Sequence, residues 1–319
     1  EKVLVFSKGA PEVIIERCCG LMTDKGRSEL DAAHWQGEAE RLSNLGYRVL
    51  ALAYQRLDEV PADDLARAEE NLDLLGLVAL IDPPREGALE AVRDCESAGI
   101  TSVMITGDHP GTAREIARRL GIGHEQQKVI TGPELDDITD EQLMAQVLDN
   151  RVYARVSPAQ KIRLVKALQT HDQFVAMTGD GVNDAPALRQ ADIGVAMGLK
   201  GTDVAREAAS MILLDDNFSS IVRAVREGRR IFDNIRKFIK YTMTSNSGEI
   251  LTLALAPLFG LPLPLLPIHI LWINLVTDGL PGLALTTQAE ERQVMRRPPR
   301  PPQESLFSHG MWQHILGIG

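Results

Sequence analysis

Two aspartates four residues apart stand in a glycine-rich stretch, Met177-Thr-Gly-Asp-Gly-Val-Asn-Asp-Ala-Pro-Ala-Leu188. The glycines on either side of Asp180 permit backbone conformations that other residues resist. Hard carboxylates beside exposed backbone N–H groups suit a Mg²⁺ ion and a phosphoryl group. The spacing of Asp180 and Asp184 therefore predicts a phosphate-handling site, with a loop of solvated carboxylates as the simpler alternative.

A short buried strand should lead into this stretch, because the apolar run Phe174–Met177 directly precedes it. Asn183 and Asp184, standing just before Pro186, indicate the start of a helix. The two aspartates would then lie at the carboxyl end of a parallel strand. Open α/β sheets bind their ligands at that edge.

Two further segments place polar groups at the same predicted edge. Thr106-Gly-Asp108 follows an expected strand, so that a hydroxyl and a turn of N–H groups would face the same rim as Asp180. Lys161 lies three residues into a helix that begins at Pro158, and its charge could offset negative charge on a transferring phosphoryl group. Without its neighbours, Lys161 would be explained better as a solvated helix residue.

Strands and helices alternate through the middle of the chain, which is typical of a doubly wound parallel sheet in the α/β class. The run Leu74–Ile81 is continuously apolar and is expected to be a parallel strand covered on both faces. The other expected strands are Ile100–Ile105, Lys128–Ile130, Val152–Ala154, Phe174–Met177 and Ile193–Ala196, and the expected helices are Glu86–Ala98, Pro110–Leu120, Asp140–Leu148 and Pro158–Leu168.

The last third of the chain has the composition of a membrane segment. Residues 250–285 form a run of 36 residues in which Asp278 is the only formal charge, which fits two helices joined by a tight turn. One long helix is expected over Asn217–Phe259. Seven Lys or Arg residues and two acidic residues between 223 and 240 mark the cytoplasmic side. The four Arg of the loop 286–305 are consistent with a return to that side.

Polar residues inside this predicted hairpin fall on single helix faces. Intramembrane carboxylates are costly and normally face a partner or an ion path. The polar set comprises Asn246 and Glu249 on the first helix and Asn274, Thr277 and Asp278 on the second. Such an all-oxygen set suits Ca²⁺, and hydrogen bonding between the helices without transport is the alternative. The helical rise predicts that Glu249, about 14 Å beyond Lys240, and Asp278, about 16 Å beyond Pro267, lie at one depth.

The string T-G-D-G-V-N-D-A-P-A-L resembles the hinge motif of P-type cation-transporting ATPases, and the resemblance extends over essentially the whole chain. K-G-A-P-E, beginning at Lys8, is similar to the part of the nucleotide-binding domain in which a Lys lies against adenine. Arg48 matches the family's Arg that reaches the ATP phosphates. Together with T-G-D and D-G-V-N-D, Lys161 matches the Lys of haloacid-dehalogenase-type phosphotransferases. W-I-N-L-V-T-D-G-L-P resembles the calcium-pump branch.

The resemblance assigns expected roles to individual residues of this chain. Thr106, Lys161, Asp180 and Asp184 are expected to be catalytic. ATP and its Mg²⁺ are expected to be bound by Lys8, Arg48, Thr106, Gly107, Asp108, Arg155, Lys161 and Asn183. Metal ligands are expected at Asp180 and Asp184 for Mg²⁺, and at Asn246, Glu249, Asn274, Thr277 and Asp278 for the transported Ca²⁺.

The resemblance also predicts how the chain is divided. The expected parts are 1–73, the C-terminal part of an α+β nucleotide-binding domain; 74–222, a haloacid-dehalogenase-like phosphorylation domain; 223–285, a stalk and two transmembrane helices; 286–305, a cytosolic loop; and 306–319, the start of a further transmembrane helix. The family's D-K-T-G-T motif, which carries the phosphorylated Asp, does not occur in this chain. We therefore expect a fragment that is inactive alone, whose partners include upstream and downstream parts of the same pump.

The leading interpretation is ATP-driven Ca²⁺ transport through an aspartyl phosphate, in a multi-pass membrane protein whose catalytic domains are cytosolic. A pump for Mn²⁺ or a monovalent cation, a membrane-tethered haloacid-dehalogenase-type phosphatase and a non-catalytic nucleotide-binding fragment are the alternatives. A net charge of −10 and only 4% aromatic residues argue against a nucleic-acid partner. The three cysteines show no metal or disulfide spacing and fit a reduced compartment.

Overall fold

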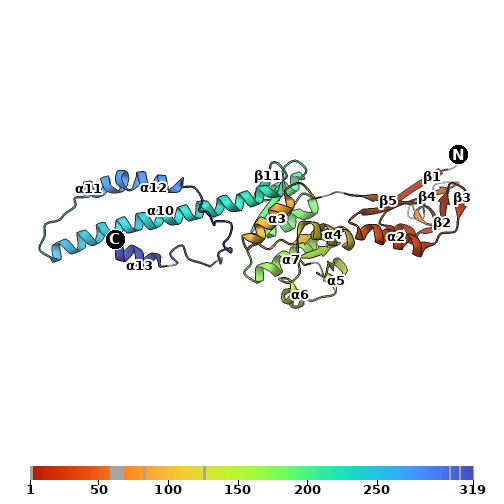
Figure 1. Cartoon of the computed structure of the whole chain (residues 1–319), viewed down its shortest axis with the longest axis horizontal. Coiled ribbons are helices and arrows are strands. Elements are labelled where there is room, and N and C mark those ends of the chain that lie inside the picture. The colour runs from red at the N-terminus through yellow and green to blue at the C-terminus, as the bar shows by residue number, and fades with distance from the viewer. Residues whose placement is uncertain are drawn as a thin grey trace. The chain divides into compact units, whose positions relative to one another are not determined.

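The computed structural model describes residues 3–57, 68–81, 84–124, 127–301, 303–308 and 310–318. The chain divides into two compact units. The first unit comprises residues 1–92 and 102–216, and the second comprises residues 93–101 and 217–319. Figure 1 labels many of the helices and strands of both units.

The first unit begins with a five-stranded sheet whose strand order is β1-β4-β5-β2-β3. Its strands are β1 (Val3–Gly9), β2 (Cys18–Thr23), β3 (Gly26–Ser28), β4 (Arg48–Leu57) and β5 (Leu72–Leu80), accompanied by helices α1 (Pro11–Glu16) and α2 (Ala32–Asn44). Side chains alternate along β1 between half-buried and exposed, as a sheet with one covered face requires. The covered face packs Ala51, Ala53, Leu72 and Leu74 against Ile14 and Ile15 of α1.

The prediction for Leu74–Ile81 is wrong in its partners. Strand β5 runs antiparallel to β4, with Arg48 opposite Leu80, and parallel to β2. It therefore completes the N-terminal sheet, whereas it was expected to open the following parallel sheet. Its C-terminal half is exposed, with Leu80 at 49% exposure, because it is not covered on both faces. A continuous apolar run does not by itself distinguish these two settings.

Among the described residues, all strand pairs in the rest of the first unit are parallel, as predicted, and they form two sheets. One sheet has the order β6-β8-β7 and the other β11-β10-β9. The strands are β6 (Met104–Ile105), β7 (Ile130–Thr131), β8 (Val152–Ala154), β9 (Ala176–Gly179), β10 (Ile193–Met197) and β11 (Met211–Leu213). Among the described residues, β6 pairs only with β8, and β9 only with β10.

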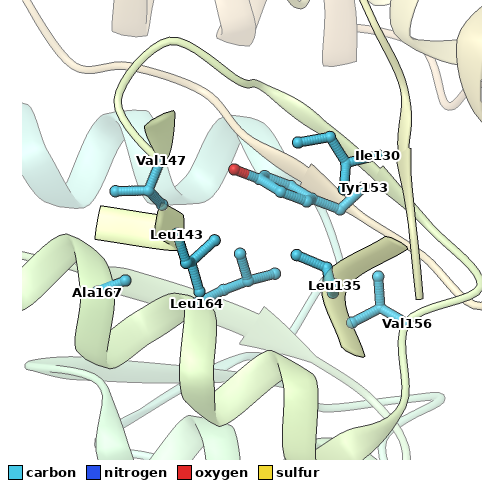
Figure 2. Packing of buried hydrophobic residues seen from close by; sticks show 8 residues of the cluster. All are labelled: Ile130, Leu135, Leu143, Val147, Tyr153, Val156, Leu164 and Ala167. Carbon is cyan, nitrogen blue, oxygen red and sulfur yellow. The ribbon is translucent and has the colours of Figure 1, made fainter. Parts of the chain in front are cut away.

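Helix α7 (Pro158–Thr170) packs into the cores beside both parallel sheets. Its Leu164 belongs to the cluster around Tyr153, shown in Figure 2, and its Val165 belongs to the cluster around Met177 and Ala196. The neighbouring helices are α3 (Ala88–Ser97), α4 (Pro110–Leu120), α5 (Gly132–Asp136), α6 (Asp140–Gln146), α8 (Ala185–Gln190) and α9 (Asp203–Ala208). Adjacent residues of α7 therefore link the two cores.

The second unit is built on α10 (Phe218–Leu258), a continuous helix of 41 residues that confirms the long helix predicted there. The segments that follow are α11 (Pro267–Trp272), a π-helical turn (Ile273–Thr277), α12 (Gly279–Thr286) and α13 (Met311–Ile318). Figure 1 shows α12 alongside α10, which it contacts. Within the described residues, Pro267–Thr286 is the one helical segment long and apolar enough to cross a membrane.

Candidate functional site

Lys161 and Asp184 form an ion pair at the end of strand β9. Lys161 Nζ lies 2.5 Å from Asp184 Oδ1, and the two side chains are only 14% and 12% exposed. The other carboxylate oxygen accepts the backbone N–H groups of Asp180 at 3.3 Å and Gly181 at 3.1 Å. Three donors thus hold the Asp184 carboxylate in place, and its contact with Lys161 Nζ fixes the position of that group at the rim of the sheet.

Short elements of sequence set this geometry. Strand β9 ends at Gly179, where a Cβ atom would lie 2.5 Å from the Asp184 Cβ, so the chain can approach this closely only at a glycine. A 3₁₀ turn over Val182–Asp184 then leads into α8, which has a proline in its first turn. On the opposite side, Ser157 caps α7: its N–H donates to Gln160 Oε1 at 2.8 Å, and its Oγ accepts the Gln160 N–H.

Asp180 differs from Asp184 because its carboxylate is exposed. Within the part of the chain that the structure describes, this carboxylate has no hydrogen-bond or ion-pair partner. Its backbone carbonyl accepts the N–H of Thr202 at 2.9 Å, which ties it to the loop Gly198–Thr202. Asn183, in the adjacent turn, is also exposed. The exposed polar groups of Asp180 and Asn183 therefore flank the Lys161–Asp184 pair.

Two charged side chains that the sequence analysis missed hold the loop Gly198–Thr202. Asp216 is 3% exposed and accepts the N–H groups of Leu199 and Lys200, each at 2.9 Å. Arg206 donates to the carbonyls of Gly198 at 3.0 Å and Gly201 at 2.9 Å. Burial alone would raise the pKa of the Asp216 carboxyl, but the backbone N–H groups that it accepts lower it below its ordinary value.

Thr106 and Asp108 form a separate group at the end of β6. The Thr106 hydroxyl lies 3.2 Å from Asp108 Oδ2 and accepts the Asp108 N–H at 3.1 Å, while Gly107 between them is exposed. Arg155 donates its N–H to the Asp108 carbonyl at 3.2 Å and forms an ion pair with Glu12. The structure shows no hydrogen bond or ion pair between this described group and Lys161 or Asp184.

Lys8 and Arg48 lie on one face of the five-stranded sheet. Lys8 of β1 is opposite Leu52 of β4, and directly opposed residues point to the same side. Arg48 is four residues before Leu52 on β4 and therefore shares this face, roughly 13 Å away along the strand. Both basic residues are exposed, as is Phe6 on the same face. Lys8 and Arg48, two of the residues predicted to bind ATP, are thus on a common, open, partly apolar surface.

In the second unit, polar side chains bridge α10 and the segment that returns along it. Asn274 Nδ2 donates to Glu249 Oε2 at 3.2 Å, and the Tyr241 hydroxyl donates to Asp278 Oδ1 at 3.2 Å. The remaining oxygens Glu249 Oε1 and Asp278 Oδ2, together with Asn246 Oδ1, are buried and have no hydrogen-bond partner. Buried acceptors without partners are costly, which makes these three oxygens candidate ligands for a cation.

The expectation that Glu249 and Asp278 lie at one depth is wrong. Asn274 contacts Glu249, whereas Asp278, four residues or about 6 Å further along its own segment, contacts Tyr241, which precedes Glu249 by eight residues on α10. Thr277 is exposed. No group of three or more acidic, His or Cys side chains gathers as a metal site among the described residues. The structure therefore arranges the five residues at two levels and does not close them into one cage.

Comparison with known proteins identifies the class to which this chain belongs. A family model described as haloacid dehalogenase-like hydrolase matches residues 9–192, and one described as cation transporting ATPase, C-terminus, matches residues 262–319. The chain belongs to the haloacid dehalogenase-like hydrolases and, among them, to the P-type cation-transporting ATPases.

Three similar curated proteins come from bacteria. The chain is 46% identical to the calcium-transporting ATPase of Bacillus subtilis, over 100% of the chain and 36% of that protein. It is 47% identical to calcium-transporting ATPase 1 of Bacillus cereus, over 97% of the chain and 35% of that protein. For calcium-transporting ATPase 1 of Lactococcus lactis, the identity is 44% over 98% of the chain and 36% of that protein. The chain thus spans about a third of the length of these relatives.

Proposed function

We propose that this chain serves ATP-driven transport of Ca²⁺ across a membrane, through a phosphoryl group carried on an aspartate. Three similar curated proteins are called calcium-transporting ATPases, which supports the ion and the energy source. The structure supports the phosphoryl-transfer site and the ion site of such a transporter separately. A fixed Lys–Asp pair lies at a strand end of the first unit, and buried unpaired oxygens lie between helices of the second.

At the proposed phosphoryl-transfer site, Lys161 offers a cation whose position is set by Asp184 and by the capped start of α7. Fixed positive charge stabilises charge that develops on a transferring phosphoryl group. The exposed Asp180 carboxylate fits Mg²⁺, which takes one or two carboxylates and completes its shell with water and phosphate oxygens. When bound there, Mg²⁺ would supply charge neutralisation at the phosphoryl oxygens. Thr106 and the N–H groups near Gly107 are donors for the same oxygens in this proposal.

The open sheet face that carries Lys8 and Arg48 is the proposed nucleotide surface. An open sheet face that carries two cations and an exposed aromatic ring suits a ligand with a planar base and a charged tail. Phe6 is 70% exposed on this face and is available for stacking. In this proposal Lys8 lies beside the base and Arg48 binds the phosphates.

The unpaired oxygens of the second unit favour a transporter over a membrane-tethered phosphatase, because a phosphatase has no use for them. Glu249 and Asp278 each keep one buried oxygen without a donor, and Asn246 contributes a third. Because these groups lie at two levels, we propose two Ca²⁺ positions along α10, one near Glu249 and Asn274 and the other near Asp278. Embedding in the membrane by several spans, with the first unit in the cytosol, belongs to the same proposal.

The two unpaired carboxylate oxygens are the observation that carries this proposal, and a chimeric pump tests it. This chain would replace the matching third of the Bacillus subtilis relative, and ATP-dependent ⁴⁵Ca²⁺ uptake would be measured in membrane vesicles. We expect uptake by the chimera and its loss in the Asp278→Asn variant. Glu290→Gln, at an exposed position of the following loop, is the control and should retain uptake. Equal uptake by Asp278→Asn and the chimera would rule out the proposed Ca²⁺ site.

A further inference from the structure

A hollow of about 260 Å³ lies in the second unit, between α10, the loop that follows α12, and the start of α13. Its walls carry Arg236, Lys237 and Lys240 from α10 and Arg297 from the loop. Asp233 and Glu291 also line it, and Met311 adds an apolar wall. This hollow is separate from the carboxylates assigned to ion binding.

Both acidic residues of the hollow are already neutralised. Asp233 pairs with Arg297 at 2.8 Å, and Glu291 pairs with Lys237 at 2.9 Å. Arg236 donates to the backbone carbonyl of Ser308 at 2.9 Å and has no carboxylate partner among the described residues. In the same described part of the chain, Lys240 Nζ has neither a hydrogen bond nor an ion pair. The hollow therefore keeps two uncompensated positive charges, one turn apart on one helix.

The hollow lies at the level where the membrane-length segment Pro267–Thr286 ends. Asn234, beside the lining residue Asp233, donates to the carbonyls of Thr286 at 3.2 Å and Gln288 at 2.8 Å. Lys237 Nζ reaches the Gln288 side chain at 3.2 Å. The end of an apolar segment that crosses a bilayer is where lipid headgroups begin. Basic pockets beside such segments bind anionic headgroups.

We propose that this hollow binds the headgroup phosphate of an anionic phospholipid, with Arg236 and Lys240 as the charged contacts. An anionic phospholipid fits better than a soluble phosphate because one wall of the hollow is apolar. Met311, 5% exposed, begins the apolar helix α13, and the next residue, Trp312, is 51% exposed. An exposed Trp at the polar end of a membrane segment is typical of the headgroup level.

Native mass spectrometry of the whole chain, released from neutral detergent micelles, tests this proposal. The micelles would contain equal amounts of phosphatidylglycerol and phosphatidylcholine. We expect one retained phosphatidylglycerol, favoured about tenfold or more over phosphatidylcholine, because two basic groups contact the phosphate. The double variant Arg236→Gln/Lys240→Gln should lose this preference. Lys240→Arg, which keeps the charge, should retain it, and this would tie the preference to positive charge at this position.

A matched control removes the same charge elsewhere on α10. Arg226→Gln/Arg230→Gln lies outside the hollow and should keep the preference. Loss in this control, or no preference in the unmodified chain, would overturn the proposal. Addition of inorganic phosphate at millimolar concentration distinguishes the two sources of phosphate. Displacement of the lipid by inorganic phosphate would identify a soluble-anion site and would also overturn the proposal.

Discussion

Lys161 and Asp184 stand 23 positions apart in the sequence and meet 2.5 Å from each other, beside the turn that carries Asp180. Because both side chains are largely buried, removal of the cation leaves a carboxylate without its partner. Lys161→Met should lower the free energy of unfolding of the first unit by about 3 kcal/mol. Urea denaturation followed by far-ultraviolet circular dichroism measures this change.

The matched control for that variant is Lys166→Met, because Lys166 is exposed on the same helix. Lys166→Met should change the free energy of unfolding by no more than about 0.5 kcal/mol. Equal stability of Lys161→Met and the unmodified chain would contradict a structural role for the pair.

In the chimeric pump, Lys161→Met should also reduce ATP turnover by about a hundredfold or more, a loss of the kind seen when one fixed electrostatic donor is removed.

Glu249→Gln should weaken Ca²⁺ binding to the chimeric pump while Ca²⁺ still binds near Asp278. Glu249 and Asp278 make separate hydrogen bonds, Glu249 with Asn274 and Asp278 with Tyr241 of α10. Loss of the Glu249 charge should therefore leave the oxygens near Asp278 in place. Equilibrium dialysis with ⁴⁵Ca²⁺ should show one of two sites weakened about tenfold or more, since a charged oxygen ligand is lost. Complete loss of all binding in Glu249→Gln would instead indicate a single shared cage.

The chain by itself should gain no acid-stable phosphate from γ-³²P-labelled ATP. Covalent catalysis requires a carboxylate nucleophile, and the D-K-T-G-T motif that carries it in the family is absent from this sequence. Acid precipitation and scintillation counting provide the measurement, and the chimeric pump provides the positive control. A Ca²⁺-dependent acyl phosphate on the isolated chain would show that another of its aspartates is the nucleophile.

Glu115 of α4 makes stability depend on pH in the acid range. Its hydrogen bond with Arg118, assisted by Arg119 and opposed by burial, lowers the pKa of the carboxyl from 4.5 to about 2. Because the pKa of this carboxyl is lower in the folded chain than in the unfolded chain, its ionised form stabilises the fold at pH values above about 4.5. This contribution is lost as the pH falls from about 4.5 to about 2. At neutral pH the free energy of unfolding of the unmodified chain should be about 1 kcal/mol larger than that of Glu115→Gln. The difference should vanish near pH 2, and a constant difference would contradict the assignment.

Asp216→Asn should loosen the loop that holds Asp180. The Asn side chain can accept only with one oxygen, whereas the carboxylate accepts from Leu199 and Lys200 with two separate oxygens. Hydrogen exchange of the segment 198–202 should therefore become faster, and the segment 152–156 around β8 is the internal reference. Unchanged protection of the loop would show that Arg206 alone is sufficient to hold it.

Local signals predicted much of the first unit. Helix α4 and strand β8 begin and end at the predicted residues, because Pro110 sets the helix start and the short run Val152–Ala154 is bounded by polar residues. Lys161 was predicted to lie at one rim with Thr106 and Asp180, and the structure brings it into contact with Asp184. In each case the deciding groups lie within a few residues of the element that they define.

Features that depend on distant parts of the chain were not predictable. Strand β5 is apolar enough for a doubly covered parallel strand, and only its pairing with β4 shows otherwise. Asp216 resembles any acidic loop residue until the loop Gly198–Thr202 folds over it. The depth of Asp278 was counted along ideal helices, but the π-helical turn at Ile273–Thr277 and the partner Tyr241 set its true level.

Strands β6 and β9 have a practical consequence for work with the isolated chain. Each is paired on one side only within the described residues, so the backbone N–H and C=O groups of its other side are free to pair with an added strand. At high protein concentration these edges are templates for self-association. A short extended peptide that occupies them would keep the chain monomeric, and the same peptide would make it more resistant to heat.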